Sequence, residues 1–90
     1  MKTIYKYKLN PGYTELELPL NAEVLHADCV GNDVFIWCLV HPEEDYAKEK
    51  RVFQVFGTGF NIPEDKRFEY VSTCKMYDGA LIWHVFEVIK

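Results

Sequence analysis

The segment Gly57-Thr58-Gly59 holds the residue types in this sequence that are best suited to binding an anion. Bare backbone amides beside a threonine hydroxyl can bind a phosphate, because glycine lets an anion approach the main chain closely. Basic side chains occur on both sides, with Arg51 before the segment and Lys66 after it. The spacing matches neither a P-loop nor a Gly-x-Gly-x-x-Gly motif. A plain turn, in which glycine supplies positive φ, is therefore the alternative to a phosphate loop.

Aromatic and histidine side chains extend this candidate site. Phe60 follows the glycine segment, and we expect its ring at the surface. Stacking of a nucleobase on such a ring is worth about 1–3 kcal/mol, although aromatic side chains more often fill the core. Trp83 and His84 lie in the last apolar stretch. There His84 contacts a ligand or a neighbouring subunit, or is a satisfied, partly buried histidine.

The sequence offers little for catalysis or metal binding. Ser72 and Thr73 can pair with His84 across strands, but no nucleophile-elbow signature accompanies them. The three histidines do not have the spacing of metal ligands, and no Cys-x-x-Cys pair occurs. We therefore expect no enzyme, no metal and no cofactor.

Period-two alternation predicts the elements that must position these residues. Runs of β-forming residues alternate between apolar and polar positions and are separated by turn residues. The turn signals are Asn10-Pro11-Gly12, Gly31-Asn32-Asp33 and Asp78-Gly79. The expected strands cover residues 3–9, 13–18, 22–30, 34–40, 51–56, 68–77 and 80–89.

These runs predict one all-β domain over residues 1–90, an antiparallel meander of about six to seven strands that is rolled or sandwich-like. Val34–Val40 is apolar on both faces, so we expect it to be a central strand. Helix should be confined to the loops around Tyr46 and Glu64. Aromatic residues make up 16% of this short chain, and such residues are favoured at interface cores. We therefore expect a homo-oligomer, a dimer or a tetramer.

Charge and composition exclude several classes of partner. The net charge of −4 argues against broad DNA or RNA binding, which needs a basic face. No apolar run has the length of a signal peptide or a membrane span, so we expect a cytoplasmic protein. The cysteines Cys29, Cys38 and Cys74 are odd in number and lie in apolar runs. We expect them to be free, buried thiols.

Three blocks of the sequence resemble a family of small phage-encoded proteins. The blocks are MKTIYKY at the start, FQVFGTGFNIP in the middle and DGALIWHVFE near the end. The resemblance covers nearly the whole chain. It implies a role like that of viral anti-CBASS sponges, oligomers that sequester a cyclic nucleotide signal of bacterial immunity without cleaving it.

A sponge needs phosphate donors and stacking surfaces but no catalyst. The residues expected to supply them are Arg51, Gly57, Thr58, Gly59, Phe60, Lys66, Trp83 and His84. Two other roles are open: a protein-binding anti-defence inhibitor that docks by an edge strand or aromatic patch, and an accessory phage protein without a ligand.

Overall fold

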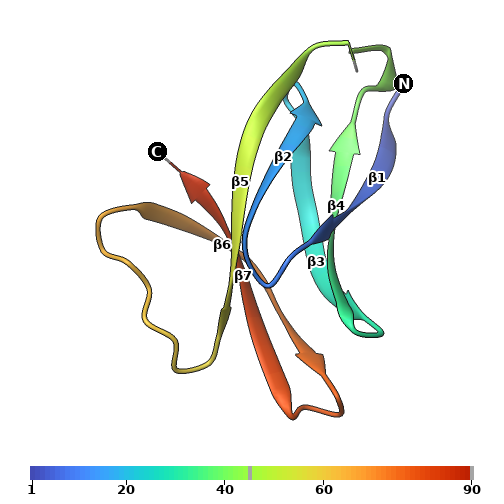
Figure 1. The fold of residues 1–90 in the computed structure, drawn as a ribbon. Coiled ribbons are helices and arrows are strands. Elements are labelled where there is room, and N and C mark those ends of the chain that lie inside the picture. Colours follow the sequence, from blue (N-terminus) through green and yellow to red (C-terminus); the bar gives the residue numbers. More distant parts are fainter. Residues whose placement is uncertain (45, 90) are drawn as a thin grey trace.

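The computed structural model describes residues 1–44 and 46–89, which form seven antiparallel strands in two sheets (Figure 1). The strands are β1 (Thr3–Leu9), β2 (Gly12–Pro19), β3 (Glu23–Val30), β4 (Asp33–Val40), β5 (Lys48–Gly57), β6 (Arg67–Met76) and β7 (Leu81–Ile89). A short 3-10 helix, η1 (Pro42–Glu44), follows β4. The all-β prediction is confirmed. Helical residues occur near Tyr46, as expected, but the described loop around Glu64 contains none.

The smaller sheet has the strand order β1-β4-β3. Its middle strand confirms the prediction for Val34–Val40, because β4 pairs with β1 on one side and with β3 on the other. Alternate residues of β4 are buried, whereas Phe35 and Trp37 are only partly covered and point away from the other sheet. The β3–β4 hairpin turns at Gly31, which has a φ of 62°. Glycine adopts this angle without strain.

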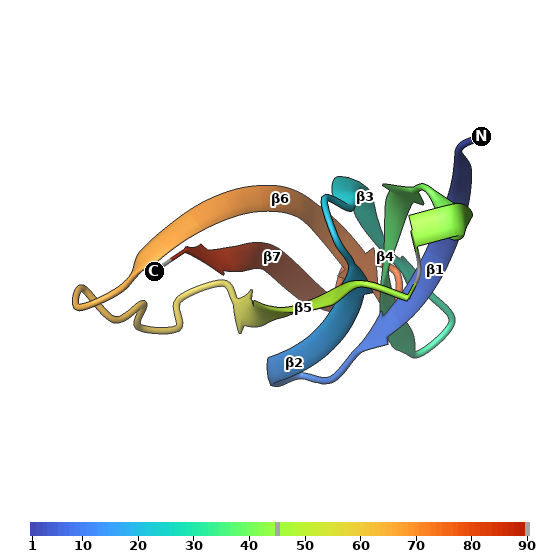
Figure 2. The same cartoon turned by 90° about the horizontal axis from the view of Figure 1, so that it is seen from above.

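The larger sheet has the order β2-β5-β7-β6. Only β6 and β7 are joined by a hairpin within it, so the strand order is not sequential along the chain. The segment from β5 to β6 must pass β7, which pairs with both of these strands. Figure 2 shows this segment at one end of the molecule and the N-terminus at the other. Pairing across β5 and β7 brings Gly57 opposite Trp83.

The two sheets are joined along both sides. On one side, the chain passes from β1 to β2 through a corner in which the Asn10 amide donates to the Thr14 hydroxyl at 2.8 Å. On the other side, β3 lies against β6, and the Ala27 amide donates to the Ser72 hydroxyl at 3.0 Å. Ser72 is therefore a buried bridge between the sheets.

A disulfide crosses the same seam and corrects one expectation from the sequence. Cys29 of β3 and Cys74 of β6 are bonded, with their Cα atoms 5.7 Å apart. The prediction of three free thiols was wrong for this pair, because adjacent sheet edges bring together two residues that are 45 positions apart. Cys38 is free and buried, as expected.

The core lies between the sheets and is built from the inward-facing residues of both. Its fully buried side chains include Leu9, Leu18, Ile36, Val40, Phe53 and Val85. Within the described residues, no helix is long and apolar enough to cross a membrane.

Candidate functional site

The Gly-Thr-Gly segment is a tight turn that extends β5. The Phe60 amide donates to the Gly57 carbonyl at 3.0 Å, and the Thr58 amide donates to the Ile82 carbonyl at 3.4 Å. Gly59 has a φ of 89°, which a residue with a side chain rarely adopts. Two of the loop amides are thus used within the fold. The amide of Gly59 is the loop donor that no described residue accepts.

Glycine is needed at positions 57 and 59 for different structural reasons. Gly59 allows positive φ, whereas Gly57 makes room for an aromatic ring. A Cβ at position 57 would lie 2.9 Å from Cε1 of Phe60, too close for an undisturbed contact. The absence of that Cβ lets the Phe60 ring fold back over the end of β5. There it meets Trp83 edge to face, with ring centroids 6.3 Å apart and an interplanar angle of 88°.

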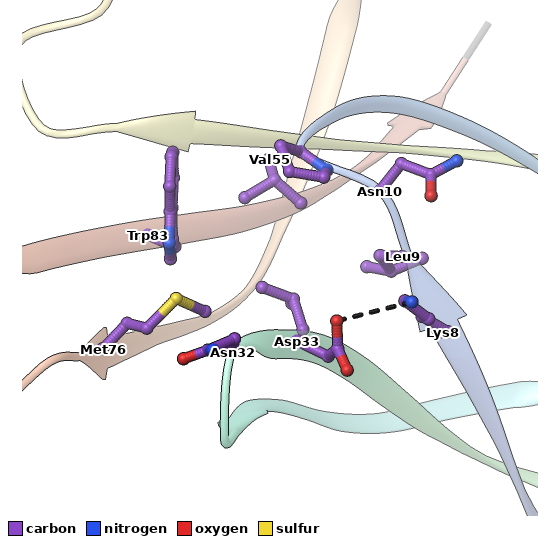
Figure 3. Close-up of a pocket in the computed structure, with 10 residues that line it drawn as sticks. Lys8, Leu9, Asn10, Asn32, Asp33, Val55, Met76 and Trp83 are labelled. Carbon is purple, nitrogen blue, oxygen red and sulfur yellow. Dashed lines mark ion pairs between the residues drawn. The ribbon is translucent and has the colours of Figure 1, made fainter.

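Trp83 is the common wall of three cavities, which we call the Trp83 hollows. Their volumes are about 210, 190 and 490 Å³. Figure 3 shows the first, in which Trp83 and Val55 of one sheet face Lys8, Leu9 and Asp33 of the other. Phe60 lines the other two hollows. This end of the sandwich is therefore concave around a single indole.

Side-chain amides supply most of the polar groups of the Trp83 hollows. Asn10 and Asn32 line the first hollow, and Gln54 and Asn61 line the third. An amide presents a donor and an acceptor side by side, which matches the edge of a nucleobase. The hollows therefore combine aromatic walls with groups that can hydrogen-bond a flat polar ring.

Charge in the Trp83 hollows is limited to one ion pair. The Lys8 Nζ lies 3.4 Å from Oδ1 of Asp33, and both side chains are about half exposed. An anion could attract Lys8 only in competition with Asp33. The hollows are thus better suited to a base than to an isolated phosphate.

His84 lies beside the turn in a chain of hydrogen-bonding groups. Its Nε2 lies 2.7 Å from the Thr58 hydroxyl, and its Nδ1 lies 3.0 Å from the Thr73 hydroxyl. The Tyr70 hydroxyl continues the chain, 2.7 Å from Thr73. The β6–β7 pairing places Thr73 opposite His84. Both ring nitrogens therefore have partners, and the imidazole orients the Thr58 hydroxyl.

The structure does not bring Arg51 to the turn. Arg51 is six residues upstream on β5, with a side chain only 17% exposed. Its Nη1 donates to the Ala22 carbonyl at 2.7 Å, and its Nε and Nη2 donate to the two carboxylate oxygens of Glu87. Hydrogen bonding to Glu87 raises the pKa of Arg51 above its usual value. This guanidinium joins β5 to β7 within the four-stranded sheet and ties β5 to the segment between β2 and β3.

Lys66 is also distant from the turn. It lines a separate hollow with Asp65 and Arg67. Of the eight residues expected in the site, the structure gathers six: Gly57, Thr58, Gly59, Phe60, Trp83 and His84.

Sequence reasoning missed the four amide side chains and Lys8. Asn10 and Asn32 were read only as turn residues, and no local signal indicates that both turns meet Trp83. Among the described residues, His, Cys, Asp and Glu form no group of three or more that could hold a metal ion.

Comparison with known proteins gives one match. A family model described as a domain of unknown function (DUF7352) matches residues 1–90. No curated protein and no solved structure matches the chain. Because the model spans the whole sequence, the chain belongs to the family described as the domain of unknown function DUF7352.

Proposed function

We propose that this protein binds a cyclic oligonucleotide in the Trp83 hollows and sequesters it without cleaving it. The observation that carries the proposal is the meeting of three cavities on one indole, with Phe60 set edge-on against it. Small-molecule sites are typically concave and apolar, with a few polar groups that fix orientation. The resemblance of the sequence blocks to phage proteins supports the same role.

Each part of such a ligand has a counterpart among these residues. A base would stack on Trp83 or Phe60, and its edge would pair with the amides of Asn61 and Gln54. A phosphate would accept from the Gly59 amide and the Thr58 hydroxyl. Lys8 would supply a positive charge at the far side of the indole. Arg51 has no part in this proposal, because it is bound to Glu87.

We propose that the ligand is not cleaved because of the groups that surround His84. A hydroxyl 2.7 Å from an imidazole nitrogen is the geometry in which a base activates a nucleophile. In a catalytic triad a carboxylate holds the opposite nitrogen and stabilises the imidazolium. Here the opposite nitrogen meets the neutral hydroxyl of Thr73 instead. His84 therefore serves to orient Thr58 as a donor.

The wider role that we propose is immune evasion by a phage-encoded homo-oligomer in the host cytoplasm. In that reducing compartment the Cys29 and Cys74 sulfurs would be thiols. Binding should therefore be measured with and without a reductant. Ligand affinity within twofold between the two conditions is the expected result, because neither sulfur lines the Trp83 hollows.

A thermal-shift screen against cyclic di- and trinucleotides tests the proposal. A ligand at about 100 times its dissociation constant adds roughly 2.7 kcal/mol of apparent stability. Linear dinucleotides of the same bases are the matched controls. The proposal fails if no cyclic nucleotide raises the midpoint, or if the bound ligand is recovered in linear form.

A second candidate function is a protein-binding inhibitor. It is favoured by an aromatic cluster on the outer face of the four-stranded sheet, formed by Phe56, Phe68, Tyr70 and Phe86. Tyr70 is 58% exposed within it. Co-purification of one host protein that Tyr70→Ala abolishes, together with no nucleotide binding, would favour the inhibitor.

A further inference from the structure

A separate hollow lies at the other end of the four-stranded sheet from Trp83. It has a volume of about 420 Å³ and is lined by Tyr13, Val52, Asp65, Lys66, Arg67, Val88 and Ile89. We call it the Lys66 hollow. Val52 lies five residues before Gly57 along β5, which corresponds to about 16 Å at 3.3 Å per residue. The Lys66 hollow shares no lining residue with the Trp83 hollows.

Strand pairing builds the apolar part of the Lys66 hollow. Val52 of β5 is directly opposite Val88 of β7, and Arg67 at the start of β6 is opposite Ile89. Tyr13 of β2 adds an aromatic ring that is 54% exposed. Four strands and the end of a loop thus contribute side chains around a common apolar floor. The residues of that floor, Val52, Val88 and Ile89, are partly exposed to solvent.

The rim of the Lys66 hollow carries two basic side chains, those of Lys66 and Arg67. Neither of these side chains makes a hydrogen bond or ion pair with any residue in the described parts of the chain. By contrast, Arg51 binds Glu87 and Lys8 binds Asp33. Asp65 supplies one negative charge at the same rim. The rim therefore carries a net positive charge beside an apolar floor, on a protein whose net charge is −4.

We propose that the Lys66 hollow is a binding site for a small organic anion with an apolar body. The acidic head, a carboxylate, sulfonate or phosphate, binds Lys66 and Arg67. The body lies against Val52 and Val88 beside the Tyr13 ring. Charge-assisted hydrogen bonds give the head its strength, and burial of the body adds the hydrophobic contribution. This proposal is independent of nucleotide binding at Trp83.

The test uses the fluorescent probe anilinonaphthalene sulfonate, an aromatic anion of suitable size, and its uncharged relative phenylnaphthylamine. The full chain is titrated with each probe, and amide chemical shifts locate the binding. We expect the sulfonate to bind at least tenfold more tightly than the uncharged probe. The largest shift changes should occur at Tyr13, Val52, Val88 and Ile89.

Charge variants give the sharper evidence. Lys66→Gln with Arg67→Gln should weaken binding of the sulfonate about tenfold, because two cations are lost. Asp65→Asn should strengthen it about twofold, because a repelling charge is removed. The matched control is Lys2→Gln with Lys75→Gln, which changes the net charge equally away from the hollow and should leave affinity within twofold.

Competition experiments distinguish the kinds of ligand that the Lys66 hollow accepts. Octanoate should displace the sulfonate probe, which would extend the site to aliphatic carboxylates, whereas inorganic phosphate should displace it only at much higher concentration. Equal binding of the charged and uncharged probes would overturn the proposal. So would an unchanged affinity in the Lys66 and Arg67 variant, shift changes confined to Trp83, or no binding of the sulfonate at all.

Discussion

Replacement of Arg51 by alanine should destabilise the fold and leave ligand affinity unchanged. Arg51 and Glu87 form a two-point ion pair in which the side chains are only 17% and 12% exposed. The same guanidinium donates to the Ala22 carbonyl. Removal of Arg51 would leave a largely buried carboxylate without its partner and a carbonyl without its donor.

The magnitude follows from the degree of burial. Loss of one partner of a fully buried pair costs about 3–5 kcal/mol, and a lost hydrogen bond to the backbone adds about 1 kcal/mol. Because both side chains retain some contact with water, we expect a loss of about 2–4 kcal/mol in the free energy of unfolding. With a urea m-value of about 1 kcal/mol/M for a domain of this size, the midpoint should fall by about 2–4 M.

Urea unfolding followed by tryptophan fluorescence measures this change. Arg67→Ala is the matched control, since its side chain is exposed and should change stability by less than about 0.5 kcal/mol. The double variant Arg51→Met with Glu87→Met should recover most of the lost stability, because it removes both charges. An unchanged midpoint in Arg51→Ala, accompanied by loss of nucleotide binding, would refute this reasoning and return Arg51 to the ligand site.

Three further predictions concern other parts of the fold. Gly57→Ala places a Cβ 2.9 Å from the Phe60 ring, so a nucleotide titration should show about fivefold weaker binding. The free energy of unfolding should change by less than about 1 kcal/mol, and equal affinity would contradict the role of Phe60. Burial raises the pKa of Cys38 to about 11, so the native state keeps this proton while the unfolded thiol loses it above pH 9. Denaturation from pH 9 to 11 should therefore show a loss of stability that exceeds that of Cys38→Ala by about 1–3 kcal/mol, whereas parallel curves would count against burial of this thiol. Light scattering should give at least twice the chain mass of 10.6 kDa at micromolar concentration, and a monomer mass would refute the homo-oligomer.

Local patterns in the sequence were sufficient to predict the strands. Alternation in residues 3–9 reports which side chains face the core. The continuous apolar run of residues 34–40 instead indicated a central strand. The turns at Gly31 and Gly79 were also visible, because both positions require the positive φ that glycine tolerates. These features depend on neighbours in the sequence.

Pairing between distant strands could not be predicted in the same way. The Cys29–Cys74 disulfide and the Arg51–Glu87 pair join residues 45 and 36 positions apart. Both depend on which strands are adjacent and on their register, and alternation alone does not specify either. For the same reason Arg51 was assigned to a phosphate on sequence grounds, although in the folded chain it binds Glu87 on the neighbouring strand β7.

In the candidate site, too, some residues could be predicted from the local sequence and others only from the fold. Phe60, Trp83 and the glycine turn were found because their residue types are unusual in one short segment. Asn10 and Asn32 were not found, because amides in turns are common and only the fold brings them to Trp83. A local motif thus indicated the residues at the centre of the candidate site, whereas the polar groups around it required the tertiary structure.

The most direct test of the central claim uses Trp83 as the reporter. In a Trp37→Phe protein, Trp83 is the sole tryptophan, and a stacked base should change its fluorescence. Titration with cyclic di- and trinucleotides should give a saturable change, and the ligand should be recovered intact after denaturation of the complex. Trp83→Leu in the otherwise natural chain should weaken binding about tenfold in calorimetry, since one stacking contact of about 1–3 kcal/mol is lost. Unchanged Trp83 fluorescence at millimolar cyclic nucleotide would contradict the account.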